Sequence, residues 1–196
     1  IPKEALLEHL KREFKVSHYH EISKYINHTK TWPKSKRILP RDFVNWFLST
    51  RYINELVSQY GSLEITDEEL IGYPNIYWRI TRPNKKNDVG PLHRDSWFWE
   101  IDKLNGKDFP KFKRLKSWIS INVEAGKNGL LVVKGSHKID NLKWNTIEKD
   151  GKFKPSLETK IPEEKKMLLN TYNNCAVTFD DDLVHGGSEN FGETTR

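Results

Sequence analysis

The order of hydrophobic and polar positions divides this chain into a helical first third and a remainder rich in short strands. Residues 3–14 place leucines and a phenylalanine at helical spacing, with lysines and glutamates on the other side. Residues 40–60 carry two adjacent apolar stripes, opened by Pro40 and closed by Gly61. We therefore predict one helix in each of these ranges and a mainly helical flank over residues 1–72.

After this flank, short apolar runs separated by turn residues replace the helical spacing. Two polar, lysine-rich stretches, 102–117 and 138–166, are predicted to be irregular loops or lids over the site. Many short strands after a helical start indicate a β-sandwich or a jelly roll with helices packed outside, and the alternative is an unrelated α+β fold. The predicted strands include residues 76–82, 117–124, 130–133, 176–179 and 183–187.

Residues 91–100 contain the strongest candidate for chemistry. This segment is short, aromatic and preceded by turn residues, so we predict a strand. Alternate residues of a strand share a face, and an imidazole and a carboxylate two positions apart can bind the same divalent ion. A second imidazole from a distant strand would complete a 2-His-1-carboxylate triad, which suits Fe(II); the alternative is a solvated surface strand. The residues predicted to share this face are His93, Asp95, Trp97 and Trp99.

Composition narrows the class of protein. The length of 196 residues suits one domain, and no repeat or low-complexity linker divides it. The net charge of +6 comes from mixed acidic and basic residues, which favours an ordinary solvated surface over a nucleic-acid interface. Such a positive field could still steer an anionic substrate inward.

Cysteine usage and hydropathy bear on the compartment. Cys175 is the only cysteine, so no internal disulfide can form, and a reducing cytoplasm is the expected location. No uninterrupted apolar stretch approaches the length that spans a membrane. We therefore expect neither a membrane nor a nucleic acid as partner, and the oligomeric state stays open.

A set of motifs in fixed order resembles one known family. His185 lies 90 residues after Asp95, and Arg196 lies eleven residues after His185. Between them stand Trp118 and the run Asn128-Gly129-Leu130-Leu131-Val132-Val133-Lys134-Gly135-Ser136-His137-Lys138. Over residues 75–196 this resembles the phytanoyl-CoA dioxygenase-like (PhyH) family of Fe(II)- and 2-oxoglutarate-dependent oxygenases. The chain departs from the family pattern at Lys134, where a proline would stand.

The resemblance implies a role for each matching residue. His93, Asp95 and His185 would hold the iron. Arg196 would pair with the distal carboxylate of 2-oxoglutarate, which suits the two-pronged arginine donor. Trp118 would lie against the same cosubstrate, and Ser188 or Asn190 would add a hydrogen bond. The alternatives are a surface arginine at position 196 and a core anchor at position 118.

The resemblance also implies a reaction and a fold. Fe(II), 2-oxoglutarate and O2 would together hydroxylate a C–H bond, with release of succinate and CO2. Halogenating members carry a small residue where this chain has Asp95, so hydroxylation is favoured. The implied fold is mainly β, a double-stranded β-helix (jelly roll) core over residues 73–196 with flanking N-terminal α-helices, in a single oxygenase domain.

Little in the sequence identifies the substrate. Trp97 and Trp99 could wall a pocket, Arg79 could bind an anionic group, and a small polar or carboxylate-bearing metabolite is the preferred class. The acids at 180–182 offer a second ligand set, of the kind that Ca²⁺ or Mg²⁺ prefers. Two other functions stay open, namely a non-catalytic metal-binding jelly roll and a basic nucleic-acid-binding module.

Overall fold

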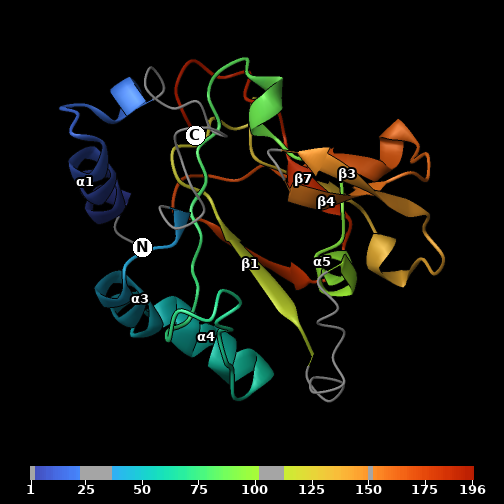
Figure 1. The fold of residues 1–196 in the computed structure, drawn as a ribbon, viewed down its shortest axis with the longest axis horizontal. Helices are drawn as coiled ribbons and strands as arrows, with labels where there is room; N and C mark the ends of the chain where they lie inside the picture. Colours follow the sequence, from blue (N-terminus) through green and yellow to red (C-terminus); the bar gives the residue numbers. More distant parts are fainter. Residues whose placement is uncertain (1–2, 23–36, 102–112, 150–151) are drawn as a thin grey trace.

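The computed structural model describes residues 3–22, 37–101, 113–149 and 152–196. Three helices, α1 (Lys3–Phe14), α3 (Arg41–Leu48) and α4 (Arg51–Tyr60), lie on one side of the molecule (Figure 1). The β3–β4 hairpin lies on the opposite side, with the β1–β6 pair between them. None of the helices in these ranges is long and apolar enough to cross a membrane.

The helix predicted over residues 40–60 is in fact two helices. The hydroxyl groups of Ser49 and Thr50 donate hydrogen bonds of 2.7 Å to the carbonyl oxygens of Trp46 and Phe47. Serine and threonine compete with the backbone in this way, so they commonly end a helix. Thr50 is extended, with φ −73° and ψ 154°, and precedes the first residue of α4. The apolar stripes therefore continue across a break that their periodicity does not reveal.

Antiparallel strands build the rest of the described chain. In one sheet β1 pairs with β6, and in a second β2 lies between β5 and β7, whereas β3 and β4 form a hairpin. The strands predicted at 130–133, 176–179 and 183–187 correspond to β2, β6 and β7. The strands are β1 (Leu115–Ile119), β2 (Leu130–Val133), β3 (Trp144–Lys149), β4 (Lys152–Leu157), β5 (Lys166–Leu168), β6 (Ala176–Asp180) and β7 (His185–Gly187).

Several expectations from the sequence are corrected. The strand predicted at 76–82 is reduced to an isolated bridge between Tyr77 and Ile38. Of the predicted loop 102–117, residues 102–112 lie outside the described residues, and β1 already begins at Leu115. The stretch 138–166 was predicted to be irregular, but it contains the β3–β4 hairpin and reaches the first residue of β5. The strand predicted at 117–124 begins earlier and ends at Ile119, and Asn122 has a φ of 58° that a strand does not allow. The strand predicted at 91–100 does not form: an isolated bridge joins His93 to His185, and helix α5 (Ser96–Ile101) follows.

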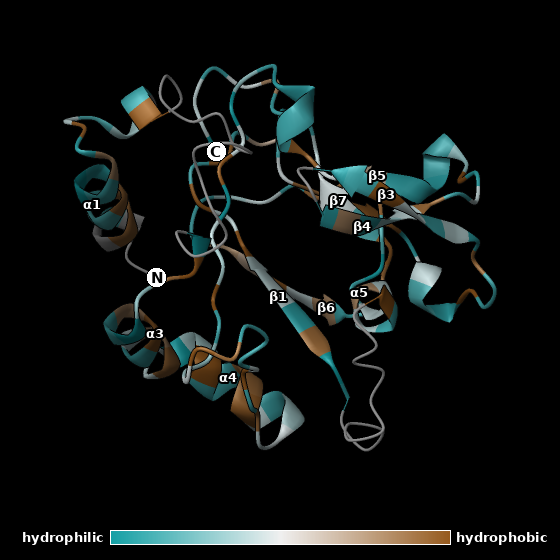
Figure 2. Ribbon diagram, in the orientation of Figure 1, coloured by the Kyte–Doolittle hydropathy of each residue, from teal (hydrophilic) through white to brown (hydrophobic). Residues whose placement is uncertain are grey.

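The hydrophobic core has three parts. The largest packs α1 and α3 against the segment around Trp78 and Ile80, which explains the apolar bands on the helices in Figure 2. The other two parts lie on opposite sides of β2: Val133 packs with Trp97 and Val184, whereas Leu130 and Val132 pack with Phe179. β2 is therefore buried on both faces, which is why its sequence is uninterruptedly apolar.

Candidate metal and cosubstrate site

The two histidines of the predicted triad lie opposite each other on adjacent backbone segments. The amide of His93 donates to the carbonyl of His185 at 3.0 Å, and the reverse bond is 2.9 Å. Residues that exchange both backbone hydrogen bonds in an antiparallel pair project their side chains to the same face. The two imidazole centroids are accordingly 4.8 Å apart, although the residues lie 92 positions apart in sequence.

Asp95 completes the group. Its backbone amide donates to the carbonyl of Asp181 at 3.0 Å, which holds the residue beside the end of β6. One carboxylate oxygen lies 3.6 Å from Nε2 of His93, and the other lies 3.7 Å from Nε2 of His185. One ligand atom from each residue lies within 4.8 Å of the other two. This is the donor set of a 2-His-1-carboxylate centre, so the structure brings the three predicted ligands together.

Local hydrogen bonds orient both imidazoles. Nδ1 of His93 lies 2.8 Å from the carbonyl of Pro91, and Nδ1 of His185 lies 2.9 Å from the carbonyl of Leu183. Since a carbonyl only accepts, Nδ1 carries the proton and the lone pair of Nε2 faces the shared centre. The ring of Phe179 packs edge-on against His185 at 4.7 Å and restricts its rotation.

The electrostatics favour the ligating protonation states. Burial alone would raise the pKa of Asp95, but Lys116, His93 and His185 outweigh it and hold that pKa well below its usual range. Burial lowers the pKa of His185 to about 4, and the charges of His93 and Lys116 act in the same direction. Asp95 is therefore ionised and His185 neutral near pH 7, as metal ligation requires.

An unsatisfied acceptor marks where a cation would fit. Oδ2 of Asp95 is buried and accepts no hydrogen bond from the described residues, and Lys116 approaches it only to 3.4 Å. A buried carboxylate oxygen without a donor is costly, and a divalent ion at the shared centre would remove that cost. The residues present therefore fit a hard or borderline divalent metal.

Arg196 lies on the same side of β7 as His185. Its backbone exchanges hydrogen bonds of 3.0 and 2.7 Å with Thr81, and its guanidinium donates to the Thr81 hydroxyl at 2.9 Å and to the carbonyl of Gly129. A Cβ placed on Gly187 would lie 3.1 Å from Nη2 of Arg196. Because Gly187 and His185 are two apart on one strand, the guanidinium is about 7 Å along the strand from the metal ligand.

Burial lowers the pKa of Arg196 to about 10, and the nearby Tyr19 acts in the opposite direction. The guanidinium therefore keeps its charge at neutral pH, which binding a carboxylate would require. Arg196 is a partly buried cation whose side-chain hydrogen bonds, within the described residues, go to neutral acceptors, so it is a candidate for binding an anion.

The remaining predicted cosubstrate residues differ in their surroundings. Trp118 is on β1, two residues after Lys116, and packs against the Leu130–Val132–Phe179 part of the core. Strand alternation places it on the same side as Lys116, which faces Asp95. Oγ of Ser188 is buried and has no hydrogen-bond partner among the described residues, so it is available to a bound molecule.

Asn190 has a different environment, because its amide is already fully hydrogen-bonded. Its nitrogen donates to the carbonyls of Thr81 and Thr194 at 2.9 and 2.8 Å. Its oxygen accepts from Asn128 at 2.7 Å and from the amide of Gly192 at 3.0 Å. These bonds tie the segment that carries Arg196 to the rest of the fold, and Asn190 is a positioning residue in this arrangement.

The shared strand face predicted for the two tryptophans does not form. Asp95 is followed by α5, so the alternation stops there. Trp97 is only 3% exposed and stacks on Trp144, with ring centroids 5.3 Å apart at 11°. Trp99 is partly exposed and lies beneath the guanidinium of Arg114 at 5.7 Å. Trp97 is thus a core residue. Aromatic residues can be buried on a helix as well as on a strand, so the aromatic pattern did not distinguish the two.

The acids at 180–182 form a second group whose carboxylate oxygens also lie within 4.8 Å of one another. Asp181 already pairs with Arg114 at 2.6 Å, and burial raises its pKa to about 6. One member of the set is therefore neutralised by an arginine and the set contains no imidazole, so it suits a transition metal less well than the His93 group.

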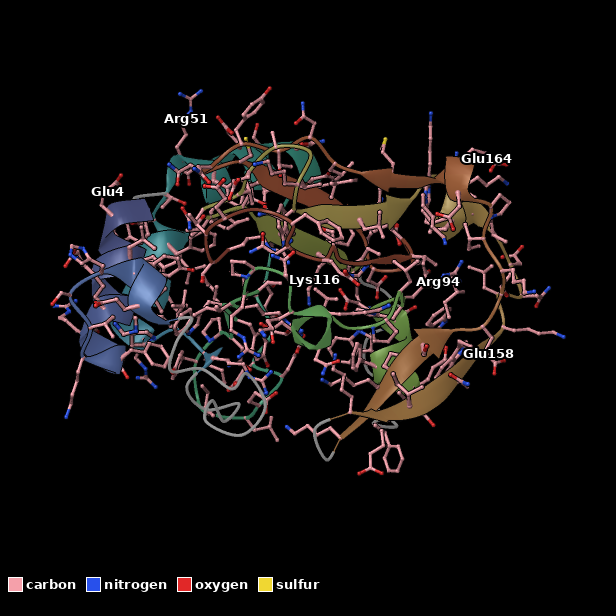
Figure 3. All side chains as sticks on the ribbon, turned by 90° about the horizontal axis from the view of Figure 1, so that it is seen from above. Glu4, Arg51, Arg94, Lys116, Glu158 and Glu164 are labelled. Carbon is pink, nitrogen blue, oxygen red and sulfur yellow. The ribbon has the colours of Figure 1, made fainter. Side chains whose placement is uncertain are left out.

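The sequence reasoning missed Lys116, whose ammonium lies 3.4 Å from Oδ2 of Asp95. Figure 3 shows the label of Lys116 near the middle of the molecule. The missed signal was its alternation with Trp118, which was hidden because the predicted strand began at residue 117. Thr81, which pairs with Arg196 through backbone and side chain, was likewise unrecognised. No local pattern distinguishes such a threonine, because its partner is 115 residues away.

Comparison with known proteins supports the site. The family model described as phytanoyl-CoA dioxygenase (PhyH) matches residues 9–196. The chain belongs to this dioxygenase family. The match extends the resemblance seen over residues 75–196 into the N-terminal helices. No curated protein and no solved structure matched the chain.

Proposed function

We propose that this PhyH-family protein is an Fe(II)- and 2-oxoglutarate-dependent dioxygenase. It would hydroxylate a C–H bond of a small-molecule substrate, with release of succinate and CO2. The observation that carries the proposal is the convergence of His93, Asp95 and His185 within 4.8 Å, with the guanidinium of Arg196 on the same side of β7. A site that only stored a metal would need no enclosed cation set back from it.

Each residue has a distinct task in this proposal. Both Nε2 atoms and the Asp95 carboxylate would hold the iron and leave positions for 2-oxoglutarate and O2. The iron, when bound, supplies the oxidative chemistry. Arg196 would bind the distal carboxylate of 2-oxoglutarate, and Ser188 would donate a further hydrogen bond to it. Trp118 would cover the cosubstrate and exclude water.

A carboxylate ligand at position 95 favours hydroxylation. Family members that halogenate carry a small residue there, which leaves room for a halide. Asp95 instead occupies that position and contributes a negative charge beside the two imidazoles. A non-catalytic metal-binding role is the runner-up, and it makes no use of Arg196.

We also propose that the sheets are parts of one double-stranded β-helix in a single domain. The support is that β6 and β7 meet at the site, since Phe179 of β6 packs on His185 of β7. The two sheets they belong to would then enclose the metal between them. A cytoplasmic location and a lack of nucleic-acid or membrane partners remain expectations from composition.

Anaerobic titration with Fe(II) and 2-oxoglutarate tests the function. We expect a weak visible charge-transfer band in wild-type protein and its loss in His185→Ala. His137→Ala is the matched control, since His137 is exposed and outside the triad, and it should retain the band. Equal spectra for wild type and His185→Ala would refute the site assignment. If Arg196→Gln shows the same charge-transfer band as wild type and still releases succinate when O2 is admitted, the role of Arg196 is refuted.

A further inference from the structure

Arg79 lies on the side of its segment that faces Arg196. Its neighbours Trp78 and Ile80 are buried in the core beneath the N-terminal helices, whereas Arg79 is exposed. Such alternation directs the side chain of Arg79 away from that core. Thr81, two residues further on, shares this direction, and its hydroxyl accepts a hydrogen bond from Arg196. The side chain of Arg79 is thereby placed on the same side as the proposed cosubstrate arginine.

Charged groups lie near the guanidinium of Arg79. Its side chain reaches solvent, yet partial burial lowers its pKa, and the charge of Arg37 acts in the same direction. The Asp95 carboxylate opposes this effect on Arg79, which places the guanidinium within electrostatic reach of the metal ligands.

Within the described residues, the side chain of Arg79 and the Nε atom of Arg37 lack the hydrogen-bond acceptors that other arginines have. Arg82 and Arg114 pair with carboxylates, and Arg94 donates to backbone carbonyls. Within the described ranges, Arg79 has no hydrogen-bond acceptor, and the buried Nε of Arg37 has none either. Neither guanidinium forms a salt bridge within the described ranges, so an anionic group would be a favourable partner for both.

We infer that Arg79, reinforced by Arg37, binds an anionic group, a carboxylate or a phosphate, on the substrate that is oxidised. The inference rests on the proposed function and names its substrate class. Arginine presents a planar fork that pairs with both oxygens of such a group. Arg196 has its own enclosed place beside Gly187, so the two arginines would serve two different anions. An anionic end held at Arg79 would orient the rest of the substrate toward the metal.

The test uses small anions that fit any such site. Wild-type protein is loaded with Zn(II) in place of iron and with saturating 2-oxoglutarate, and is titrated with inorganic phosphate, acetate and neutral acetamide. Dissociation constants come from NMR line broadening of the probe. We expect phosphate and acetate to bind and acetamide not to bind. Arg79→Gln should weaken anion binding about tenfold or more, since it removes a charged hydrogen-bond pair.

Matched controls separate this site from general surface charge. Arg12→Gln removes an exposed arginine of α1 and should bind the anions as wild type does. Arg37→Gln should weaken them less than Arg79→Gln. If Arg79→Gln does not fold, judged by thermal melting, Arg79→Lys keeps the charge without the fork and should bind several-fold more weakly. No anion binding by wild type, or equal binding by wild type and the Arg79 variant, overturns the inference.

The affinity for 2-oxoglutarate distinguishes the two proposals. Arg79→Gln should leave it unchanged, and a loss there would assign Arg79 to the cosubstrate and overturn the inference. If the wild-type protein binds phosphate but no 2-oxoglutarate, and Arg79→Gln abolishes the phosphate binding, the proposed function fails while the anion site stands. If 2-oxoglutarate binds normally and Arg79→Gln leaves the affinity for phosphate unchanged, only the inference fails.

Discussion

The guanidinium of Arg196 lies directly over Gly187, two residues beyond the metal ligand His185. A Cβ at Gly187 would lie 3.1 Å from Nη2, so a methyl group there would force the guanidinium to shift. The distance between the proposed iron and the proposed 2-oxoglutarate carboxylate is therefore set by one short strand, β7. A small residue at this position is needed for the arginine rather than for the backbone.

Gly187→Ala should weaken 2-oxoglutarate binding about tenfold while leaving metal affinity nearly unchanged. The added methyl group displaces the guanidinium from the place where it meets a carboxylate. Gly90→Ala is the matched control, because nothing lies within 4 Å of a Cβ at that position. Dissociation constants from the anaerobic titration check the prediction. Unchanged 2-oxoglutarate affinity in Gly187→Ala would show that Arg196 is not where the cosubstrate binds.

Lys116→Met should tighten metal binding by about three- to tenfold. The ammonium lies 3.4 Å from Oδ2 of Asp95, so it competes with a metal ion for that oxygen and repels it. The effect is modest because Lys116 is partly exposed and its charge is screened. Competition of Zn(II) against a chromophoric chelator measures the affinity, with the exposed Lys113→Met as control. Weaker binding in Lys116→Met would instead mean that the lysine holds Asp95 in its ligating position.

The stability of the metal-free protein should rise with pH between about 4 and 6.5. Burial lowers the pKa of His185 to about 4, so the unfolded chain takes up a proton in this window while the folded chain does not. The stabilisation is complete above the unfolded value and amounts to roughly 3 kcal/mol at most. Urea unfolding at a series of pH values should show a smaller slope for His185→Gln. His137→Gln, an exposed histidine, should keep the wild-type slope, and identical slopes in all three proteins would contradict the assignment.

Ser136→Ala should lower the free energy of unfolding by about 1–3 kcal/mol, because it leaves a buried amide unpaired. The amide of Val184, next to His185, donates to the Ser136 hydroxyl at 2.7 Å, and both residues are fully buried. This bond explains the serine in the Gly-Ser-His-Lys run of the sequence. Chemical denaturation measures the loss, and Ser58→Ala, on the exposed side of α4, should change stability by less than about 0.5 kcal/mol. A loss no larger than that of Ser58→Ala would show that the amide is satisfied in another way.

Spacing along the chain, read with the family resemblance, was enough to predict that His93, Asp95 and His185 come together, as the structure shows, and it singled out Arg196 as a candidate. Few residue types can bind a metal ion, and the family pattern fixes their order along the chain. The motif can therefore be recognised without knowing which residues are in contact. Periodicity likewise identified α1, β2 and β6, because burial of one helix face or of a whole strand leaves a repeat in the residues themselves. These features depend on local rules that the sequence carries.

Packing alone decided the rest. Whether residues after Asp95 form a strand or α5 depends on where Trp97 finds its partners, Trp144 and Val184, and these lie far away in sequence. The approach of Lys116 to Asp95 and the effect of Arg37 on Arg79 depend in the same way on which segments lie side by side. Contacts between distant residues, and the burial that shifts their pKa values, exist only once the chain has folded. The sequence therefore determined which side chains could bind a metal ion, and the tertiary structure determined their environment.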